Sequence, residues 1–223
     1  TYRLTGAKCL IAMTLCGIPI IVGFFIPVLI LGNLSVKYFS RVWTPDFQVL
    51  IFNSLWLSGL AAVLCASCAL FINYSRRLGE SHFLGFMTRV ASLGYAIPGA
   101  VLAIGVLVPF AALDNLVDQL MRNFFDISTG LVLSGTVIAV LFAYVVRFMM
   151  ISVGQIESSL GKISQSVDMA ARTLGYNARE TMVRYHLPLI KGGILTALTI
   201  VFVDCMKELP ATLILRPFGF ETL

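Results

Sequence analysis

Three ionisable side chains, Asp204, Lys207 and Glu208, lie in an otherwise apolar stretch near the end of the chain. Charged groups at membrane depth are costly, and they usually face a cavity, a partner or the interior of a helix bundle. Spacings of three and four residues place these side chains on one helix face, where they can neutralise one another. Pro210 follows and interrupts a helix. The pattern predicts either a structural ion pair near the membrane surface or a translocation path with a gate.

Other reactive side chains do not form a catalytic or metal-binding pattern. Cys65 and Cys68 have redox or metal spacing, but they lie in mid-span with no His or acidic residue nearby, so we interpret them as packing residues. His82 and His186 lie far apart at the edges of apolar runs, which favours a surface or interface position. The sequence has no Gly-rich phosphate loop, no HExxH and no GxSxG. We expect no catalytic residue, metal ligand or bound cofactor, and any ATP is expected to be hydrolysed by another subunit.

A polar, basic segment, 168–188, lies between two membrane-length apolar runs. Its pattern predicts two short helices broken at Gly175, because glycine accepts the left-handed backbone of a helix C-terminal cap. Ser164 or Ser166 is placed to cap the first helix, a second helix begins three residues after the glycine, and Pro188 ends it. A folded helical hairpin between two spans is a handle for a partner protein.

Composition indicates which elements must hold these residues. The chain is 58% hydrophobic and 12% charged, and its mean hydropathy is +0.92, whereas a soluble domain carries about 25% charged residues. A helix needs about 20 residues to cross roughly 30 Å of hydrocarbon. We therefore expect an all-α polytopic membrane protein with about five spans. They are placed near residues 9–31, 50–72, 90–112, 129–150 and 190–215.

Basic residues are distributed unevenly between the two sets of span ends. Eleven lie at one set of ends: Arg3, Lys8, Arg76, Arg77, Arg89, Arg147, Lys162, Arg172, Arg179, Arg184 and Lys191. Four lie at the opposite ends: Lys37, Arg41, Arg122 and Arg216. The positive-inside rule then places the N-terminus and the loops 73–89 and 151–189 in the cytoplasm. The net charge of +5 reflects this topology and does not indicate nucleic-acid binding.

The third predicted span carries Pro98 at its middle. Proline removes one backbone hydrogen bond and kinks a helix unless neighbours compensate. The glycines at positions 94, 99 and 105 allow close helix contacts. Two interpretations stay open, ordinary membrane packing and a hinge beside a translocation path, and Pro98 is the candidate hinge residue.

The 168–188 segment resembles the EAA loop of type I ABC importer permeases, whose pattern is Glu-Ala-Ala, three residues, Gly, nine residues, Ile, any residue, Leu-Pro. The corresponding residues are Met169-Ala170-Ala171, Gly175 and Tyr185-His186-Leu187-Pro188, with every spacing kept. Met169 stands where Glu is usual, and Tyr185 stands where Ile is usual. Asp168, next to the vacant acidic position, is a partial substitute for that Glu.

The resemblance extends over most of the chain. Segment 53–58 is similar to the opening of the permease core in this family. Segments 92–99 and 207–220 are similar to its ferric-iron branch, in which one long chain commonly contains two such halves. The chain resembles the C-terminal half without its final helix, so at least one more span is expected beyond it. The resemblance implies an N-terminal transmembrane helix and external loop over 1–47, and a permease core over 48–223 with the coupling loop 151–189.

The resemblance also implies partners and a location. The location is the bacterial inner membrane. The partners are a pair of ABC ATPase subunits that hold ATP and Mg, a periplasmic iron-binding protein, a second permease half or subunit, and membrane lipid. Ferric iron is the favoured substrate, and the alternatives of the same architecture carry a polyamine, a phosphonate or thiamine. An ion-coupled secondary transporter, which also uses intramembrane charges and broken helices, is a more distant alternative.

Two sets of residues are the candidate functional residues. The resemblance implies ATPase coupling, as a rigid-body push on the spans, for Asp168, Met169, Ala170, Ala171, Arg172, Gly175, Arg179, Leu187 and Pro188. The intramembrane charges and prolines suggest a translocation path or gate at Pro98, Asp204, Lys207, Glu208 and Pro210. Arg172, Arg179 and Arg184 are expected either to pair with acidic groups of the ATPase or to contact solvent and lipid headgroups.

Overall fold

The computed structural model describes residues 5–79, 82–217 and 219–222, and within these ranges all regular structure is helical. The expected all-α class is therefore confirmed. The chain divides into two compact units, Thr1–Val49 and Leu50–Leu223. In the part of the chain that the structure describes, five helical runs are long and apolar enough to cross a membrane, as predicted. They are Ala7–Val42, Pro45–Leu78, Gly99–Phe125, Val137–Leu160 and Ala178–Met206.

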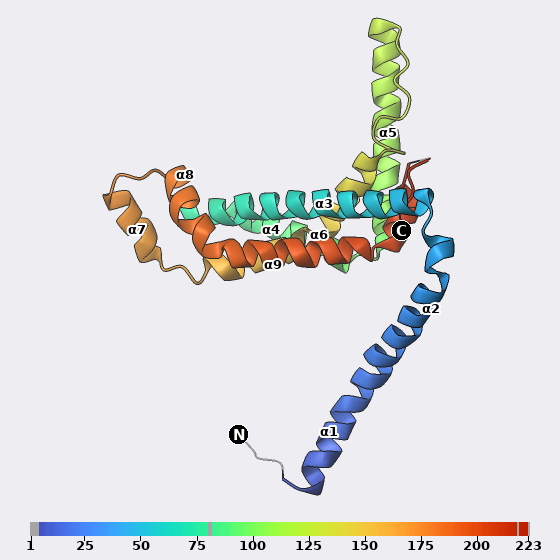
Figure 1. The fold of residues 1–223 in the computed structure, drawn as a ribbon. Helices are drawn as coiled ribbons and strands as arrows, with labels where there is room; N and C mark the ends of the chain where they lie inside the picture. The colour runs from blue at the N-terminus through green and yellow to red at the C-terminus, as the bar shows by residue number, and fades with distance from the viewer. Residues whose placement is uncertain (1–4, 80–81, 218, 223) are drawn as a thin grey trace. The chain divides into compact units, whose positions relative to one another are not determined.

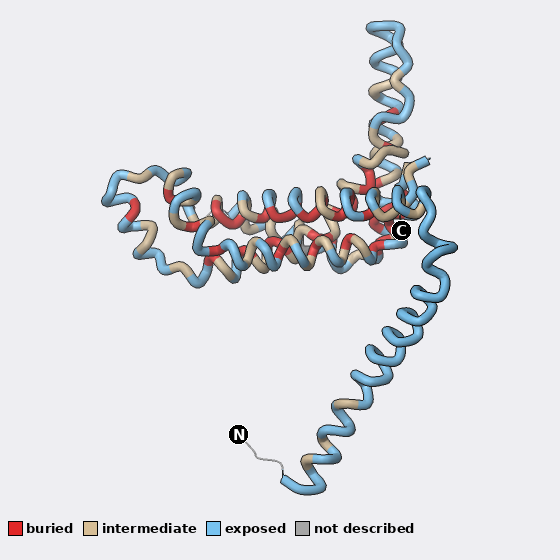
Figure 2. Tube along the Cα trace, in the orientation of Figure 1, coloured by how far each residue is buried: buried red, intermediate tan, exposed pale blue. Residues whose placement is uncertain are grey.

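The first unit is one long helical run (Figure 1). It contains α1 (Ala7–Ile20), the π-helical turn η1 (Ile21–Phe25) and α2 (Ile26–Val42), and the start of the next helix, up to Val49, completes the unit. None of the residues of these three elements is buried, and Figure 2 shows the run without a buried segment. A helix that is apolar all round and exposed is suited to contact with lipid or with another span.

The second unit is a bundle whose long helices run side by side, with α5 pointing away from them (Figure 1). Its elements are α3 (Pro45–Leu78), α4 (His82–Ala96), α5 (Gly99–Phe125), α6 (Val137–Leu160), α7 (Gln165–Thr173), α8 (Ala178–Thr181), the π-helical turn η2 (Met182–His186), α9 (Leu187–Met206) and α10 (Leu209–Leu215). Helix α6 is central, because it packs against both α4 and α9 and accepts hydrogen bonds from α3.

Small side chains fill the centre of the bundle. Ala61, Ala139 and Ala143 are fully buried, and such residues let transmembrane helices approach closely. Cys65 is buried with them, and its Sγ lies 3.9 Å from the carbonyl oxygen of Val145 on α6, while Cys68 is exposed. The buried faces of the long helices point toward one another (Figure 2). Cys65 thus occupies a packing position between α3 and α6.

The helical run through Pro98 is broken, not merely kinked. α4 ends at Ala96 and α5 begins at Gly99, so the expectation of a single span over 90–112 is wrong. Pro98 has an extended backbone, with φ −56° and ψ 137°, and a proline also disfavours helical geometry in the residue before it. The break leaves the carbonyl of Ile97 without a helical partner, and α5 departs from the bundle at this point.

The last predicted span also divides. α9 ends at Met206 and a short α10 follows, so a single span over 190–215 is wrong. Glu208 caps α10, because its side-chain oxygen accepts a hydrogen bond from the N–H of Ala211 at 3.4 Å. Pro210 occupies the first turn of α10, where the missing backbone donor costs nothing.

Pro188 does not end a helix, and that prediction is wrong. α8, η2 and α9 form one run from Ala178 to Met206. Proline normally breaks a helix because it lacks an N–H and its ring clashes with the carbonyl four residues earlier. The wider π turn immediately before Pro188 relieves both conflicts. The same arrangement occurs in the first unit, where η1 ends two residues before Pro27.

Candidate functional site

Helices α7 and α8 form the hairpin that the sequence predicts. The Ser164 side chain caps α7 by accepting a hydrogen bond from the N–H of Ser166 at 3.3 Å. At the other end, Gly175 has a φ of +81°, which is left-handed backbone. The N–H of Tyr176 donates to the carbonyl of Ala171 at 3.0 Å, and the N–H of Gly175 closes the inner bond of the same cap. The predicted cap and the predicted break are both confirmed.

The second arm of the hairpin starts with a capping box. Asn177 Oδ1 accepts from the N–H of Glu180 at 2.9 Å, and Glu180 Oε2 accepts from the N–H of Asn177 at 2.9 Å. The rings of Tyr176 and Tyr185 meet edge to face at 5.5 Å, with Arg184 stacked over Tyr176. Tyr185, which replaces the usual Ile of the EAA pattern, thus packs back onto the turn after Gly175.

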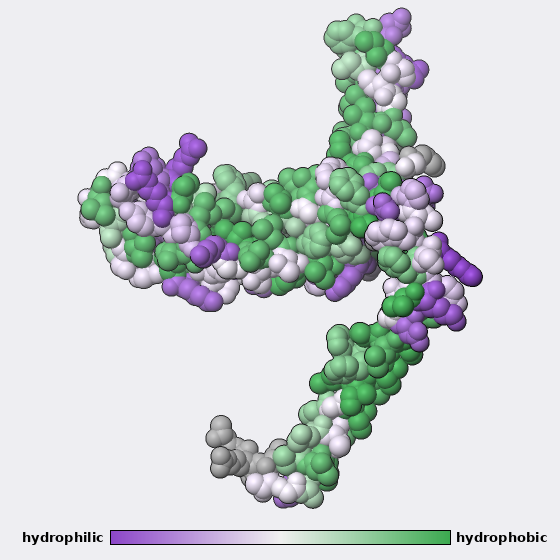
Figure 3. Space-filling view, viewed as in Figure 1, coloured by the Kyte–Doolittle hydropathy of each residue, from purple (hydrophilic) through white to green (hydrophobic). Residues whose placement is uncertain are grey.

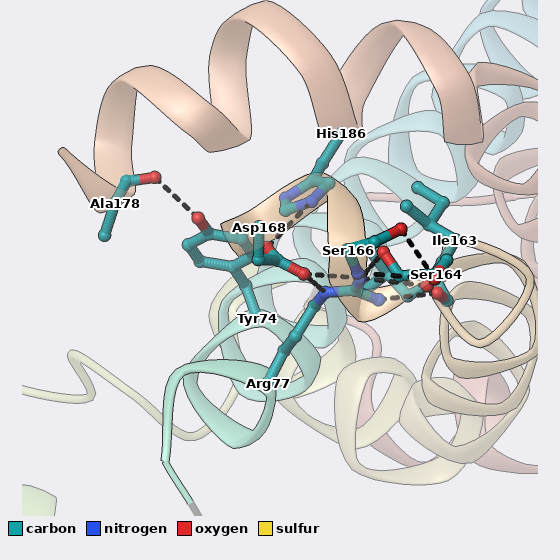
Figure 4. A network of polar contacts seen from close by, with 9 residues as sticks. Tyr74, Arg77, Ile163, Ser164, Ser166, Asp168, Ala178 and His186 are labelled. Atoms are coloured by element: carbon teal, nitrogen blue, oxygen red, sulfur yellow. Dashed lines mark hydrogen bonds and ion pairs between the residues drawn. The ribbon is translucent and has the colours of Figure 1, made fainter. Parts of the chain in front are cut away.

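A single arginine ties the start of the hairpin to the end of α3 (Figure 4). Arg77 donates to Asp168 Oδ2 from Nε at 3.0 Å and from Nη2 at 2.7 Å. It also donates to the carbonyl oxygens of Leu160 at 2.7 Å and Ile163 at 2.9 Å. The last carbonyls of a helix have no intrahelical partner. Arg77 therefore satisfies the end of α6 and holds α7 at the same time.

The other carboxylate oxygen of Asp168 faces His186 (Figure 4). Asp168 Oδ1 lies 3.1 Å from His186 Nε2, and the His186 side chain is fully buried. The expectation of a surface or interface histidine is therefore wrong, because the hairpin folds over this ring. Tyr74 packs against the His186 ring at 5.5 Å and donates to the carbonyl of Ala178 at 2.5 Å. This polar network, Tyr74–Arg77–Asp168–His186, joins both arms of the hairpin to α3.

The predicted coupling residues divide between the exposed and the buried side of the hairpin. Met169, Ala170, Arg172, Gly175, Arg179 and Pro188 are exposed, Asp168 and Leu187 are half-buried, and Ala171 is buried. The exposed tip also carries Leu174, which is 71% exposed, beside Met169 at 62%. Figure 3 shows hydrophilic and apolar side chains mixed over this end of the bundle. Asp168 therefore turns inward to Arg77, while Met169, at the usual Glu position, points outward.

A second arginine lies inside the bundle. Arg147 Nε lies 2.9 Å from Glu208 Oε2, and the two side chains are 19% and 8% exposed. Arg147 Nη1 also donates to the carbonyl of Ile97, the group freed by the break before Pro98. Gly99 lies against the same carboxylate, since a Cβ at this position would overlap Glu208 Oε1. Arg147 thus bridges the α4–α5 break and the α9–α10 break.

This arrangement differs from the predicted charge pattern in two respects. Glu208 does not share a helix face with Asp204 and Lys207, because α9 ends at Met206. Lys207 Nζ lies 4.0 Å from Asp204 Oδ1 and is mostly exposed, so neutralisation within the trio is limited to that pair. Arg147 is not at a span end either, since it lies in the interior of α6.

Sequence reasoning missed four residues of these clusters: Tyr74, Arg77, Arg147 and Ile97. The sequence pattern indicates Arg77 and Arg147 only as charges that set the orientation. One usable signal was Arg147 itself, because an arginine ten residues inside an apolar helix needs a buried acceptor. No group of three or more His, Cys, Asp or Glu side chains that could hold a metal ion occurs among the described residues. The interactions in both clusters are ion pairs and hydrogen bonds from arginine to backbone carbonyls.

The similar proteins found by comparison are all named as transport-system permease proteins. Fe(3+)-transport system permease protein FbpB 2 of Haemophilus influenzae is 28% identical over 178 residues, which is 80% of this chain and 32% of that protein. A putative 2-aminoethylphosphonate transport system permease protein, PhnV, of Salmonella typhimurium is 25% identical over 217 residues, or 91% of this chain and 76% of the relative. Spermidine/putrescine transport system permease protein PotB of Haemophilus influenzae is 20% identical over 173 residues, or 78% and 60%.

The chain spans about a third of the length of the Haemophilus influenzae FbpB 2 protein that it matches. The family described as binding-protein-dependent transport system inner membrane component matches residues 83–220. That range is more than half of the chain, and it contains the α7–α8 hairpin and both helix breaks. The chain therefore belongs to the family of binding-protein-dependent transport system inner membrane components.

Proposed function

We propose that this chain is part of the transmembrane permease of an ATP-driven importer. The α7–α8 hairpin receives movement from the ATPase subunits, and ferric iron is the proposed cargo. The observation that carries the proposal is the contrast within the hairpin. Its tip is exposed and carries apolar and basic side chains, while its base is fixed by the Tyr74–Arg77–Asp168–His186 network. A rigid base with an exposed tip is suited to transmit a push from a docked partner.

The contacts at the base define which helices the push would reach. Arg77 belongs to α3 and binds the end of α6, and His186 leads directly into α9. Displacement of Asp168 by a partner would therefore act on three long helices at once, α3, α6 and α9. Breaking a largely buried ion pair costs about 3 kcal/mol, so the pair resists local yielding and passes the displacement on.

The Arg147–Glu208 pair is the proposed gate. Leu57 and Glu208 line the same small cavity, and Leu57 lies 20 positions before Arg77 on α3. A rise of about 1.5 Å per residue puts the two arginine clusters roughly 30 Å apart along α3, which is about the thickness of a hydrocarbon core. The hairpin and the gate then lie at opposite membrane faces. Opening the path would require the α4–α5 and α9–α10 breaks to move relative to one another.

Orientation follows from the basic residues. With Arg147 assigned to the interior of α6, ten basic residues remain at one set of ends against four at the other. The positive-inside rule then places the hairpin and the N-terminus in the cytoplasm and the gate toward the outside. In this orientation a pair of ATPase subunits, which hold ATP and Mg, docks at the hairpin tip. A periplasmic binding protein and a second permease half complete the proposed assembly.

Two substrates have support. Ferric iron is favoured by the FbpB 2 relative and by the segments 92–99 and 207–220. A phosphonate is the second candidate, because the PhnV relative aligns over 91% of this chain and over 76% of its own length. The FbpB 2 alignment covers a smaller share of both proteins.

The test is ATP hydrolysis by the intact transporter in proteoliposomes, with candidate binding proteins added empty or loaded. Stimulation only by the ferric-loaded protein would support both the importer and the cargo. Stimulation only by a 2-aminoethylphosphonate-loaded protein would keep the importer and reject iron. Absence of stimulation, together with uptake driven by an ion gradient, would reject the importer and favour the secondary transporter.

A further inference from the structure

A cavity of about 720 Å³ opens between the end of α3, the start of α4 and the end of α6. Cavities of 300–1,000 Å³ are typical of small-molecule sites. The ionisable side chains that line it are Arg76, Arg77, His82, Arg89 and Glu157. Glu80 and Ser81, between α3 and α4, lie outside the described residues, and the described lining belongs mainly to α3, α4 and α6. It lies apart from the exposed hairpin tip and from the Arg147–Glu208 pair.

The charges around this cavity do not cancel within the described part of the chain. Arg77 is paired with Asp168, and Arg76 is paired with Glu157 at 3.0 Å. Arg89 is exposed and has neither an ion-pair nor a hydrogen-bond partner among the described residues. Among the described residues, the lining therefore carries three guanidinium groups and one carboxylate, and the guanidinium of Arg89 has no partner there. Guanidinium groups in this arrangement are suited to bind a phosphate by paired hydrogen bonds.

An apolar stripe begins at the same cavity. Phe83, Phe86, Val90 and Leu93 are exposed on α4. Their spacings of three and four residues place them on one helix face. Phe86 also lines the cavity. A basic cavity therefore continues directly into an exposed apolar stripe along a helix of the bundle.

We propose that this cavity binds the phosphodiester headgroup of an anionic phospholipid, and that an acyl chain of the same lipid lies along the Phe83–Leu93 stripe. Arginines at the ends of spans place their charge at the membrane surface, where they attract anionic headgroups. A free phosphate would satisfy Arg89 but would leave the stripe uncovered. The lipid matches both parts of the surface, and the bound lipid would contact the end of α3 and the start of α4 next to the network that holds the hairpin.

The test uses the intact permease with its ATPase subunits in nanodiscs of phosphatidylethanolamine containing phosphatidylglycerol. Retained lipid is counted by native mass spectrometry after transfer to a mild detergent. Each arginine near a membrane surface contributes enough attraction for about a fivefold change in binding. Arg89→Gln is therefore expected to lower phosphatidylglycerol retention about fivefold, and Phe86→Ala is expected to lower it as well. Arg89 is exposed, and its replacement removes no ion pair or hydrogen bond within the described part of the chain.

Lys191→Gln is the matched control, because it removes one exposed cation of α9 that does not line the cavity. Equal retention by wild type, Arg89→Gln and Lys191→Gln would overturn the proposal. Inorganic phosphate is titrated in a parallel arm. Displacement of the retained lipid by millimolar phosphate, with Phe86→Ala behaving as wild type, would assign the cavity to a soluble anion and would also overturn it.

Discussion

The chain contains two arginine–carboxylate pairs that differ in what surrounds them. Arg77 pairs with Asp168 and also donates to three backbone carbonyls, while Asp168 has His186 as a second partner. Arg147 pairs with Glu208, and beyond the pair it reaches the single carbonyl of Ile97. The first pair belongs to a network with several side-chain partners, whereas the second is joined, among the described residues, only to backbone groups, the carbonyl of Ile97 and the N–H of Ala211. Loss of one member should therefore be tolerated better at the hairpin than at the helix breaks.

The largest effect is expected for Arg147→Met. It leaves the Glu208 carboxylate buried without its cation, which costs about 3–5 kcal/mol. Glu208→Met alone is expected to cost a similar amount, since it leaves Arg147 buried. The measurement is thermal unfolding of the purified complex in detergent.

The double variant Arg147→Met, Glu208→Met sharpens this prediction, because a buried pair replaced by apolar side chains is often neutral for stability. We expect recovery of most of the lost stability without recovery of uptake. If uptake also recovers fully, the pair is structural and the proposed gate is rejected. If Glu208→Gln transports at the wild-type rate, the same conclusion follows.

The next largest effect is expected for Arg77→Met. The base of the hairpin loses a partly buried pair, one bond to the end of α6 at Leu160 and one to the following turn at Ile163, with a cost of about 2–3 kcal/mol. We expect ATP hydrolysis that no longer responds to a loaded binding protein, while His186 and Tyr74 keep the hairpin folded. Arg76→Met is the control, since its pair with Glu157 is well exposed and is worth at most about 1 kcal/mol. Equal uncoupling by both variants would contradict this assignment.

A smaller effect is expected at Gly175. Gly175→Ala places a Cβ on left-handed backbone and costs about 1–2 kcal/mol, whereas Gly175→Asn costs less because asparagine adopts this conformation more readily. Gly192→Ala is the matched control, with ordinary backbone and open space around it. Coupling is measured by co-purification with the ATPase and by uptake.

Gly175→Asp extends this test to the docked state. It should leave the protein in the membrane but separate uptake from ATP hydrolysis, since a charged side chain would intrude between hairpin and ATPase. Full uptake by this variant would refute a docking role for the turn. A defect in Gly175→Ala that Gly175→Asn does not share would trace the effect to backbone strain alone.

The smallest effect is expected for Met169→Glu, which restores the usual acidic residue of the EAA pattern. Met169 is exposed, so we expect a change in unfolding free energy below about 0.5 kcal/mol. Asp168 already supplies the inward carboxylate to Arg77, and a second acid at the tip does not replace it. A large gain in stability, measured by denaturation, would mean that the inward role belongs to position 169.

Local rules explain which parts of the hairpin were predictable. The Ser164 cap and the Gly175 turn depend on a few adjacent residues, and both follow from sequence. The all-α class and the number of spans follow from composition, because lipid leaves helices as the simplest way to satisfy the backbone. These features need no knowledge of distant contacts.

Contacts between distant segments were not predictable in the same way. Arg77 is 91 positions before Asp168, and Arg147 is 61 positions before Glu208, so charge spacing along one helix points to the wrong partners. The rule that predicts a helix end at Pro188 assumes an α-helix, and the π turn that precedes it changes the geometry. The pattern around Pro98 predicts a kink, whereas the structure has a complete break. The break is stable because the carbonyl of Ile97 that it frees accepts a hydrogen bond from Arg147 on another helix.

The π turn η2 determines how α9 faces its neighbours. Each residue of an α-helix rotates the chain by about 100°, so the turn sets the angular offset between the hairpin and every side chain after Pro188. Ile190 and Ala197 are buried and belong to one cluster with side chains of α6. Deletion of one residue within η2 would rotate α9 by about 100° relative to α8 and carry both side chains off α6. The length of this turn therefore matters more for the packing of α9 on α6 than the identity of most of its residues.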